Sequence, residues 1–300
     1  MATMATKPTT PEPPPAPVPA IAVIIPHYND VARLARCLTA LAPQLAPDVE
    51  LVVVDNGSTD SLEPARPALP GVQTGTEPAK GAAPARNRGV AETTAPVLAF
   101  IDSDCLPAAD WVEMARKTAA RTDGDLFGGR IDVFDETPPP RSGAEAFEAV
   151  FAFDWRGYIE KKGVSVTANL VTRRGVFQAA GPFIHGVSED LEWCRRATAK
   201  GFRLLAAPDL RVGHPSRQDW GALHKKWLRM TREGFELEPS RARWVLKALA
   251  MPVSALAHLP KVLVSPRLSG AERLRGAATL VRLRLARMVW MLRQAAGDRI

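Results

Sequence analysis

The sequence predicts an α/β fold in which a mainly parallel, Rossmann-like sheet is flanked by helices. Two short runs of aliphatic and β-branched residues, 21–25 and 51–54, are typical of parallel strands that are covered on both faces. Between them, residues 31–45 carry leucines at helical spacing behind Asp30, a favourable N-cap residue. A strand, a helix and a second strand in this order indicate a βαβ unit, from which parallel sheets are built.

The same alternation continues along the chain. We expect a third strand near Val72, a helix over 82–92 and a fourth strand over 97–101. Asp110 and Glu113 have the spacing of a capping box, which predicts the start of another helix.

The second half of the chain is expected to be mixed in structure. Prolines 138–140 indicate a loop. After it we expect a short helix over 174–180, a longer helix from the N-cap Ser188 to Lys200, and a closing strand over 202–206.

The composition is that of a globular domain with an appended segment. The chain has 300 residues, of which 46% are hydrophobic, so it can bury a full core. Residues 1–20 are Pro-rich and lack the basic start and apolar core of a signal peptide, so we expect a disordered tail there. The three cysteines form no CxxC pair, which favours a reduced, cytoplasmic chain. An α/β domain over 21–215 and a basic, amphipathic helical region over 216–300 complete the expected organisation.

The charge is unevenly distributed along the chain. Residues 201–300 hold 19 Lys and Arg against 7 Asp and Glu, whereas residues 1–200 hold 20 against 25. This asymmetry favours an acidic partner for the last third, either anionic lipid or nucleic acid.

Two carboxylates directly follow the fourth predicted strand, in Asp102-Ser103-Asp104. Ligands of open α/β sheets bind at the carboxyl ends of the strands, and paired acidic oxygens there suit a hard divalent cation that also holds phosphate oxygens. An isolated Asp-x-Asp is more often a turn with a helix cap, so the neighbouring strand ends must decide between the two interpretations.

Those neighbouring strand ends supply partners for a nucleotide. Asp55 ends the second strand, where its carboxylate can accept hydrogen bonds from a base or a ribose. After the first strand, Tyr28 offers an aromatic ring for stacking on a base. The segment 85–89 brings Arg86 and Arg88 near the same rim. Base, ribose and diphosphate therefore all find partners at this edge of the sheet.

Taken in order, these motifs make the sequence resemble the inverting, family-2 glycosyltransferases with the GT-A fold, over roughly residues 21–214. The stretches that carry the resemblance are Val23-Ile24-Ile25-Pro26-His27-Tyr28-Asn29, Val54-Asp55-Asn56-Gly57-Ser58-Thr59-Asp60, Ala85-Arg86-Asn87-Arg88-Gly89, Phe100-Ile101-Asp102-Ser103-Asp104, Ala168-Asn169-Leu170 and Glu189-Asp190-Leu191-Glu192-Trp193-Cys194-Arg195-Arg196. Together they are specific, although each alone is not. They imply a GT-A glycosyltransferase domain over 21–215.

The resemblance implies a nucleotide-sugar donor, with uridine as the commonest base of the family and guanosine or thymidine as the alternatives. The base would lie between Tyr28 and Asp55, assisted by Arg86. The other implied donor-binding positions are Pro26, Asn29, Asp102 and Ser103.

The resemblance also implies a divalent ion, Mn²⁺ or Mg²⁺, that holds the diphosphate. Asp104 would bind this ion directly, with Asp102 as a second acidic ligand. His214 lies where the family often has a further metal ligand, and a structural hydrogen bond is the alternative role for a His beside a Pro.

Glu189 and Asp190 are the candidates for the catalytic base, because an inverting transfer needs a carboxylate that takes a proton from the acceptor hydroxyl. The resemblance favours Asp190. Since the pair lies in the first turn after Ser188, we expect the helix N-terminus to favour the charged carboxylate and to lower its basicity. The alternative is that the two acids serve only the helix dipole.

Four aromatic or amide side chains are candidate sugar contacts, with packing as the alternative. They are Asn169, Trp193, Trp155 and Tyr158. We interpret the cysteines, including Cys105 beside the acidic pair, as structural.

Residues 225–300 combine cations with apolar residues. Segment 244–264 is interrupted by Lys and Pro, so it makes a poor membrane span and is expected to lie at an interface. Over 273–293, arginines alternate with apolar residues as in a helix that lies in anionic headgroups. Its apolar residues are Leu280, Val281, Leu283, Leu285, Met288, Trp290, Met291 and Leu292. The alternative is a helical pair packed on the domain. No nucleic-acid-binding motif accompanies the charge, so we expect no nucleic acid partner.

The predicted function is that of a metal-dependent, inverting, hexosyltransferase-type glycosyltransferase, which adds a sugar to a lipid-linked or cell-envelope glycan. We expect it to be cytoplasmic and peripheral at the inner membrane. A sugar-nucleotide nucleotidyltransferase would need a Gly-rich phosphate loop after the first strand, which residues 26–29 do not form. A phosphatase of the Asp-x-Asp type would carry its acids on the first strand. A non-catalytic, membrane-docked binding module of the same fold is the remaining alternative, against which Asp104 and Asp190 argue.

Overall fold

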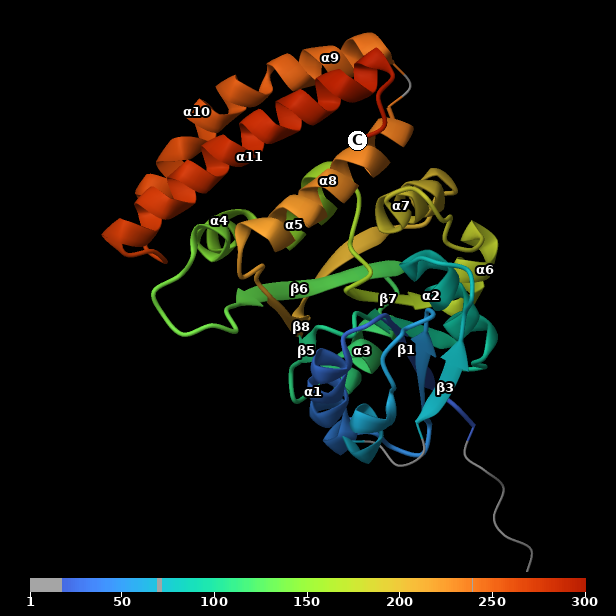
Figure 1. Ribbon diagram of the computed structural model, residues 1–300. Helices are drawn as coiled ribbons and strands as arrows, with labels where there is room; N and C mark the ends of the chain where they lie inside the picture. Colours follow the sequence, from blue (N-terminus) through green and yellow to red (C-terminus); the bar gives the residue numbers. More distant parts are fainter. Residues whose placement is uncertain (1–17, 69–71, 239) are drawn as a thin grey trace, which may run out of the picture.

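The computed structural model describes residues 18–68, 72–238 and 240–300 (Figure 1). Most of the expected tail, residues 1–17, lies outside this described part. Within the described chain, one sheet of eight strands has the order β3-β2-β1-β4-β7-β6-β8-β5. The predicted α/β fold is therefore confirmed.

The first half of the sheet is parallel, as expected. β1 (Ile21–His27) pairs in parallel with β2 (Val49–Asp55) and with β4 (Val97–Ile101), and β2 pairs in parallel with β3 (Gln73–Thr76). The carboxyl ends of these four strands consequently meet at one edge.

The second half of the sheet is mixed. β7 (Asn169–Arg173) is antiparallel to β4 and to β6 (Leu126–Phe134). β8 (Leu204–Pro215) runs parallel to β6 and antiparallel to the short β5 (Leu106–Pro107). The closing strand that was expected over 202–206 is thus much longer, and its extension brings His214 next to the loop that follows β4.

Both faces of the sheet are buried, because the strand side chains alternate between two cores. In β1, Val23 and Ile25 point to the side of α1 (Val31–Leu41) and α3 (Trp111–Ala119). Ile24 points to the side of α2 (Ala82–Ala91), α6 (Arg174–Ala180) and α7 (Glu189–Ala199). A Cβ at Gly89 would lie 2.5 Å from Cγ2 of Ile24, so glycine lets α2 pack directly on β1.

Three local predictions are corrected by the structure. α1 ends at Leu41, because Pro43 lies in a separate 3-10 turn over Ala42–Gln44. Asp110 precedes α3, but its side chain caps no backbone N–H, so the predicted capping box is wrong. Ser188 occupies the N-cap position of α7 without capping it, since its hydroxyl donates to Glu233 at 3.1 Å.

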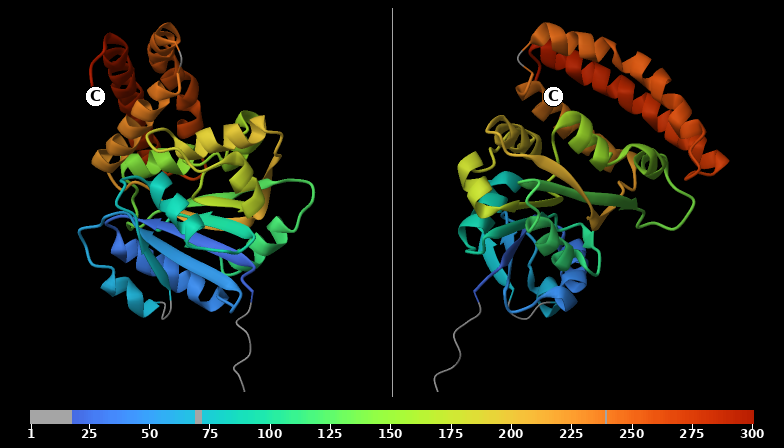
Figure 2. Two further views of the ribbon diagram at one scale, coloured as in Figure 1. Left: turned by 90° about the vertical axis from the view of Figure 1, so that its right-hand side faces the viewer. Right: turned by 180° about the vertical axis from the view of Figure 1, so that it is seen from behind.

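The C-terminal region is helical, as expected, with α8 (Trp220–Glu236), α9 (Arg241–Leu249), α10 (Met251–Leu263) and α11 (Gly270–Ala296). Figure 2 shows α9 and α10 running back along α11 as a hairpin, with α8 between this hairpin and the sheet. The hairpin packs on α4 (Gly143–Phe151) through a third core that includes Phe147, Leu223 and Leu280. In the described ranges no single helix is long and apolar enough to cross a membrane; α9 and α10 together are, but with a bend of 46° between them.

The prediction that the apolar residues of α11 face lipid is partly wrong. Four of its apolar side chains are buried against neighbouring helices, namely Leu280, Leu283, Trp290 and Met291. Val281, Leu285 and Val289 of the same run remain exposed. The broad apolar surface of α11 is therefore divided between a packed side and an outer side.

Candidate active site

The loops after β1 and β2 are tied together at the sheet edge. The Asn29 N–H donates to Ser58 Oγ at 2.9 Å, and the Asp55 carboxylate accepts the Ser58 N–H at 3.2 Å. Tyr28 stands beside them with 56% of its surface exposed. Tyr28, Asn29 and Asp55 therefore lie at one rim, whereas Pro26 is buried within β1.

Arg86 of α2 holds two carboxylates from different parts of the chain. Its Nη2 donates to Asp102 Oδ1 at 2.5 Å and its Nη1 to Glu189 Oε1 at 2.8 Å, while its side chain is only 4% exposed. Burial alone would lower the pKa of Arg86, but the charges of Asp102 and Glu189 outweigh burial and raise this pKa. Arg86 thus joins the loop after β4 to the start of α7, and these two ion pairs use one N–H of each of its Nη groups.

Asp190, next to Glu189, has a different environment. Its carboxylate accepts the N–H of Leu191 at 2.8 Å, and within the described chain it forms no ion pair. Burial and then the charge of Glu189 raise the pKa of Asp190 from an ordinary 3.8 to about 7, against the opposing charge of Arg86. The expectation that Asp190 has a lowered basicity is therefore wrong, because burial and the charge of Glu189 raise its pKa. A carboxyl group with this pKa can accept a proton at neutral pH.

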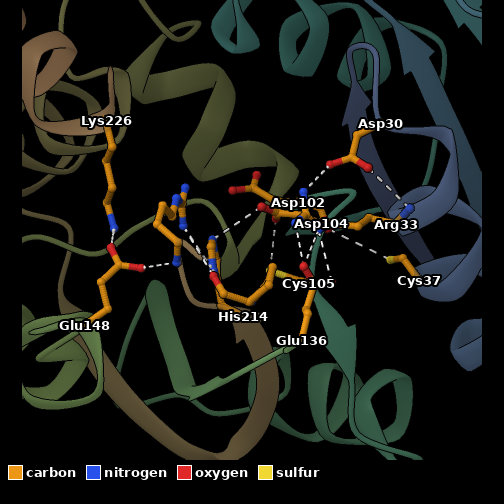
Figure 3. A network of polar contacts seen from close by, with 12 residues as sticks. Asp30, Arg33, Cys37, Asp102, Asp104, Cys105, Glu136, Glu148, His214 and Lys226 are labelled. Carbon is orange, nitrogen blue, oxygen red and sulfur yellow. Dashed lines mark hydrogen bonds and ion pairs between the residues drawn. The ribbon is translucent and has the colours of Figure 1, made fainter. Parts of the chain in front are cut away.

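A second group of side chains has the geometry of a metal site. The ligand atoms of Asp104, Cys105 and His214 all lie within 4.8 Å of one another, and Asp104 Oδ2 is 3.6 Å from His214 Nε2 (Figure 3). His214 Nδ1 lies 2.8 Å from the carbonyl oxygen of Pro215, which assigns the proton to Nδ1 and leaves the lone pair of Nε2 facing Asp104. Burial lowers the pKa of His214, against the charge of Asp104.

The donor set of this group fits a divalent ion. A carboxylate and a neutral imidazole are ligands that Mn²⁺ accepts. The Cys105 thiol lies 3.8 Å from Asp104 Oδ1, and burial raises the pKa of Cys105 well above its ordinary value, so the thiolate that metals prefer is disfavoured. Asp104 and His214 are therefore the better ligands, and Asp102 already gives one oxygen to Arg86.

A buried network connects this group to the C-terminal helices. The side chain of Glu148 in α4 is 2% exposed, and it accepts Lys226 Nζ of α8 at 2.6 Å and the Arg217 N–H at 2.7 Å. Burial alone would raise the pKa of Glu148, but the charges of Lys226 and Arg217 lower it. Glu148 thereby fixes the loop after β8, in which Arg217 borders a pocket of about 160 Å³ that Asp104 also lines.

Two of the candidate sugar contacts are structural instead. Asn169 is fully buried, donates to two backbone carbonyls at 2.9 Å each and accepts from Trp111 Nε1 at 3.0 Å. Trp193 is also fully buried and donates to a backbone carbonyl at 2.8 Å. Neither side chain can reach a sugar in this structure. Trp155 and Tyr158, in α5 (Trp155–Lys162), are partly buried, and Tyr158 packs against the core beside α7.

Arg217 and Glu148 were not predicted from the sequence as neighbours of the site, and Cys105, beside the acidic pair, was interpreted as structural. The available signal for Arg217 was a cation three residues after His214. Nothing in the sequence around Glu148 distinguishes it from an ordinary helix glutamate.

Comparison with known proteins gives a family and several relatives. The family model described as Glycosyl transferase family 2 matches residues 22–181. Glycosyltransferase AglE of Haloferax volcanii is 31% identical over 243 residues, which cover 78% of this chain and 77% of that protein. The pre-mycofactocin glycosyltransferase of Mycobacterium tuberculosis is 29% identical over 215 residues, which cover 67% of this chain and 44% of that protein.

Solved structures share the fold. A mannosyltransferase from Pyrobaculum calidifontis, in complex with GDP-Man and Mn²⁺, has a TM-score of 0.55 at 18% identity and covers 98% of this chain and 80% of its own. Glucosyl-3-phosphoglycerate synthase from Mycobacterium tuberculosis, in complex with phosphoglyceric acid, has a TM-score of 0.51 at 18% identity, with coverage of 71% and 76%. At such low identity the likeness concerns the fold alone.

Proposed function

Because the chain belongs to glycosyl transferase family 2 and is a glycosyltransferase, we propose that it transfers a sugar, with inversion at the anomeric carbon, from a nucleoside diphosphate to a glycan. The observation that carries this proposal is a pair of neighbouring groups at one sheet edge. Asp104 with His214 suits a metal-bound diphosphate, and Asp190 suits a proton acceptor. Arg86 links the two groups through Asp102 and Glu189.

We propose that Asp104 and His214, with Asp102 beside them, hold Mn²⁺ or Mg²⁺. When bound, the ion supplies positive charge that stabilises the departing diphosphate. Arg217 adds a cation to the lining of the pocket that Asp104 also lines. Support for the ion and the donor class also comes from the Pyrobaculum mannosyltransferase, which binds GDP-Man and Mn²⁺.

The nucleoside would bind at the rim formed by Tyr28, Asn29 and Asp55, with Ser103 close to the diphosphate. An exposed aromatic ring can stack on a base, and the Asp55 carboxylate can accept a base or ribose donor. We propose a UDP-sugar as donor, with GDP- and dTDP-sugars as the alternatives.

In the transfer, Asp190 takes the proton of the acceptor hydroxyl. As the acceptor oxygen bonds to the anomeric carbon, the bond from that carbon to the diphosphate oxygen breaks, and the diphosphate leaves with the electron pair. Glu189 accepts a hydrogen bond from Arg86, so the start of α7 and the base that follows are held relative to the donor loop.

Calorimetric titration with UDP, GDP and dTDP, each with and without Mn²⁺, tests the donor site. Binding of one diphosphate only in the presence of metal, lost in Asp104→Ala and retained in the exposed control Asp209→Ala, would support it. No binding of any diphosphate to the wild-type protein would refute it and favour a binding module without turnover.

We further propose that the acceptor is lipid-linked or part of the cell envelope, and that residues 225–300 contact an anionic membrane at its cytoplasmic face. Ten of the fourteen exposed large apolar side chains in the described chain lie between residues 246 and 289. On α10, Val253 and Leu256 are exposed while Ala255 and Val262 are buried, so the exposed side chains point away from the packed side. Residues 240–300 also hold 12 Lys and Arg against 2 Asp and Glu, which complements anionic headgroups.

Vesicle flotation tests this contact. Wild-type protein should float with vesicles that contain phosphatidylglycerol and not with phosphatidylcholine alone. The variant V253E/L256E should lose flotation, and V18E, which places the same charge at an exposed apolar residue outside the hairpin, should retain it. Dimerisation of the wild-type protein without flotation would instead assign the apolar face to a second copy of the chain.

A further inference from the structure

Two arginines of α11 lie partly buried without a counter-ion. Arg284 and Arg287 are one helical turn apart, and the Nε–H group of each is buried with no hydrogen-bond partner. Among the described residues, no carboxylate acts on either side chain. Burial, and then the charge of Arg284, lower the pKa of Arg287 to about 10. The helix therefore holds two positive charges close together in partly buried positions, where burial disfavours the charged form of each side chain.

A third unpartnered donor lies in the same place. The guanidinium of Arg287 stacks on the indole of Trp227 in α8, 4.6 Å from the ring centroid. The Nε1–H of Trp227 is itself buried without a partner. Gln294 does not balance these donors, because its own Oε1 accepts no hydrogen bond. Native proteins leave few buried N–H groups without an acceptor, so these three, on Arg284, Arg287 and Trp227, call for an acceptor from outside the chain.

We propose that Arg284, Arg287 and Trp227 form a binding site for a phosphate group that is carried by a lipid. A phosphate offers several acceptor oxygens and at least one negative charge, so it can engage two guanidinium groups at once. A guanidinium fork matches phosphate geometry, and such charge-assisted bonds are stronger than neutral ones.

The position of the site favours a lipid as the source of the phosphate. α11 carries both arginines on its packed side and the exposed residues Val281, Leu285 and Val289 on its outer side. The contact of Arg287 with Trp227 lies between α11 and α8, and Figure 1 shows α8 between the outer helices and the sheet. The choice of a lipid rests on the proposed membrane contact, whereas the phosphate chemistry rests on the arginines and Trp227 alone.

Thermal unfolding in EDTA tests the site, with inorganic phosphate or vesicles containing phosphatidic acid as the two probes. The proteins compared are the wild type, R284Q/R287Q and R282Q. Arg282 is the matched control because it lies on the same helix and stacks on Trp220 at 3.9 Å from the ring centroid, but is exposed. Without a probe, R284Q/R287Q should unfold at the same or a higher temperature than the wild type, since it removes two desolvated charges.

With a probe, the unfolding temperature of the wild type and of R282Q should rise, and that of R284Q/R287Q should not. The apparent affinity of the double variant should fall roughly 10- to 100-fold. A response to vesicles alone would identify a lipid headgroup, and a response to both probes would identify the phosphate group itself as the ligand.

Three results would overturn the proposal. The wild type could respond to neither probe, the double variant could respond as the wild type does, or the double variant could be less stable without a probe and keep its response. The last result would make the arginines packing residues only. Titration of the wild type with Mn²⁺ and a nucleoside diphosphate reports separately on the donor site, so failure of one proposal is distinguishable from failure of the other.

Discussion

The protonation of Asp190 makes a quantitative prediction for the dependence of the rate on pH. Burial and the charge of Glu189 raise the pKa of Asp190 from 3.8 to about 7. A base with this pKa is about one-tenth deprotonated at pH 6 and about nine-tenths at pH 8, so kcat/KM should rise about tenfold between these values. A carboxylate with an ordinary pKa would be deprotonated at both, and the profile would be flat.

The substitution Glu189→Gln perturbs this pKa specifically. It removes the negative charge next to Asp190 and keeps an oxygen that can accept from Arg86. Loss of the like charge should lower the pKa of Asp190, and the midpoint of the profile should move down by about one pH unit. Asp190→Asn removes the base and should lower kcat by about 10²- to 10⁴-fold at every pH.

Initial rates of donor consumption at saturating metal measure these profiles. Binding of the nucleoside diphosphate must be titrated at each pH as a control, because phosphate groups and imidazoles also titrate in this range. The assignment fails if wild-type kcat/KM is constant between pH 6 and 8, or if the slope persists in the residual activity of Asp190→Asn. The stability of the fold should follow the opposite trend with pH. The pKa of Asp190 is higher in the folded than in the unfolded state, so the free energy of unfolding should fall as pH rises from about 4 through 7. Asp190→Asn should remove that fall.

Three stability predictions accompany this one. Asn169→Ala should cost about 3 kcal/mol or more in urea unfolding, because it leaves two buried carbonyls and an indole N–H unpaired; a loss below 1 kcal/mol would contradict its structural role. Lys226→Met should cost about 3–5 kcal/mol by leaving Glu148 buried without its counter-ion, and Glu148→Met in the same protein should recover most of the loss; additive losses would argue against the pair. Gly89→Ala should cost roughly 1–3 kcal/mol, because its Cβ would lie 2.5 Å from a sheet side chain, while Gly175→Ala, with open space around its Cβ, should leave the melting temperature nearly unchanged.

The parallel half of the sheet and its strand-end acids were predictable, because they depend on local patterns. Continuous aliphatic runs indicated β1, β2 and β4, and whatever follows such strands must lie at their carboxyl edge. This rule alone brings Asp55 and Asp102 to one rim. The motifs after the strands, taken in order, then indicated the family that the family model confirms.

Features that depend on long-range register were not predictable. Asn169 lies opposite Ile101 because β7 is inserted antiparallel between β4 and β6, which no local pattern in residues 169–173 reveals. The bridge from Arg86 to Glu189 joins residues 103 positions apart. The prediction for the pKa of Asp190 was wrong for a related reason. Its position in the first turn of a helix can be predicted from the sequence, but the burial that dominates its pKa cannot.

The surface of α11 shows a third kind of limit. Its apolar residues are spread so widely around the helix that the sequence does not tell which of them face a neighbouring helix. The structure assigns Leu283 and Trp290 to the packed side and Leu285 and Val289 to the outer side. A prediction of membrane contact from the whole helix was therefore too broad.

The expected division of the chain after residue 215 separates groups that work together. His214 is the last residue but one of β8, and Arg217 follows in the loop whose backbone Glu148 binds. The same Glu148 pairs with Lys226 of α8, on the other side of the division.

The third core also connects α4 to the C-terminal helices, through apolar side chains. Phe147, which precedes Glu148 in α4, packs in one cluster with Leu223 of α8 and Leu280 of α11. Removing residues 216–300 would expose this core and leave Glu148 without both of its partners, next to the loop that carries His214. The helices proposed to contact the membrane are therefore connected to the loop that follows His214, and Lys226 of α8 and Glu148 of α4 form one such connection.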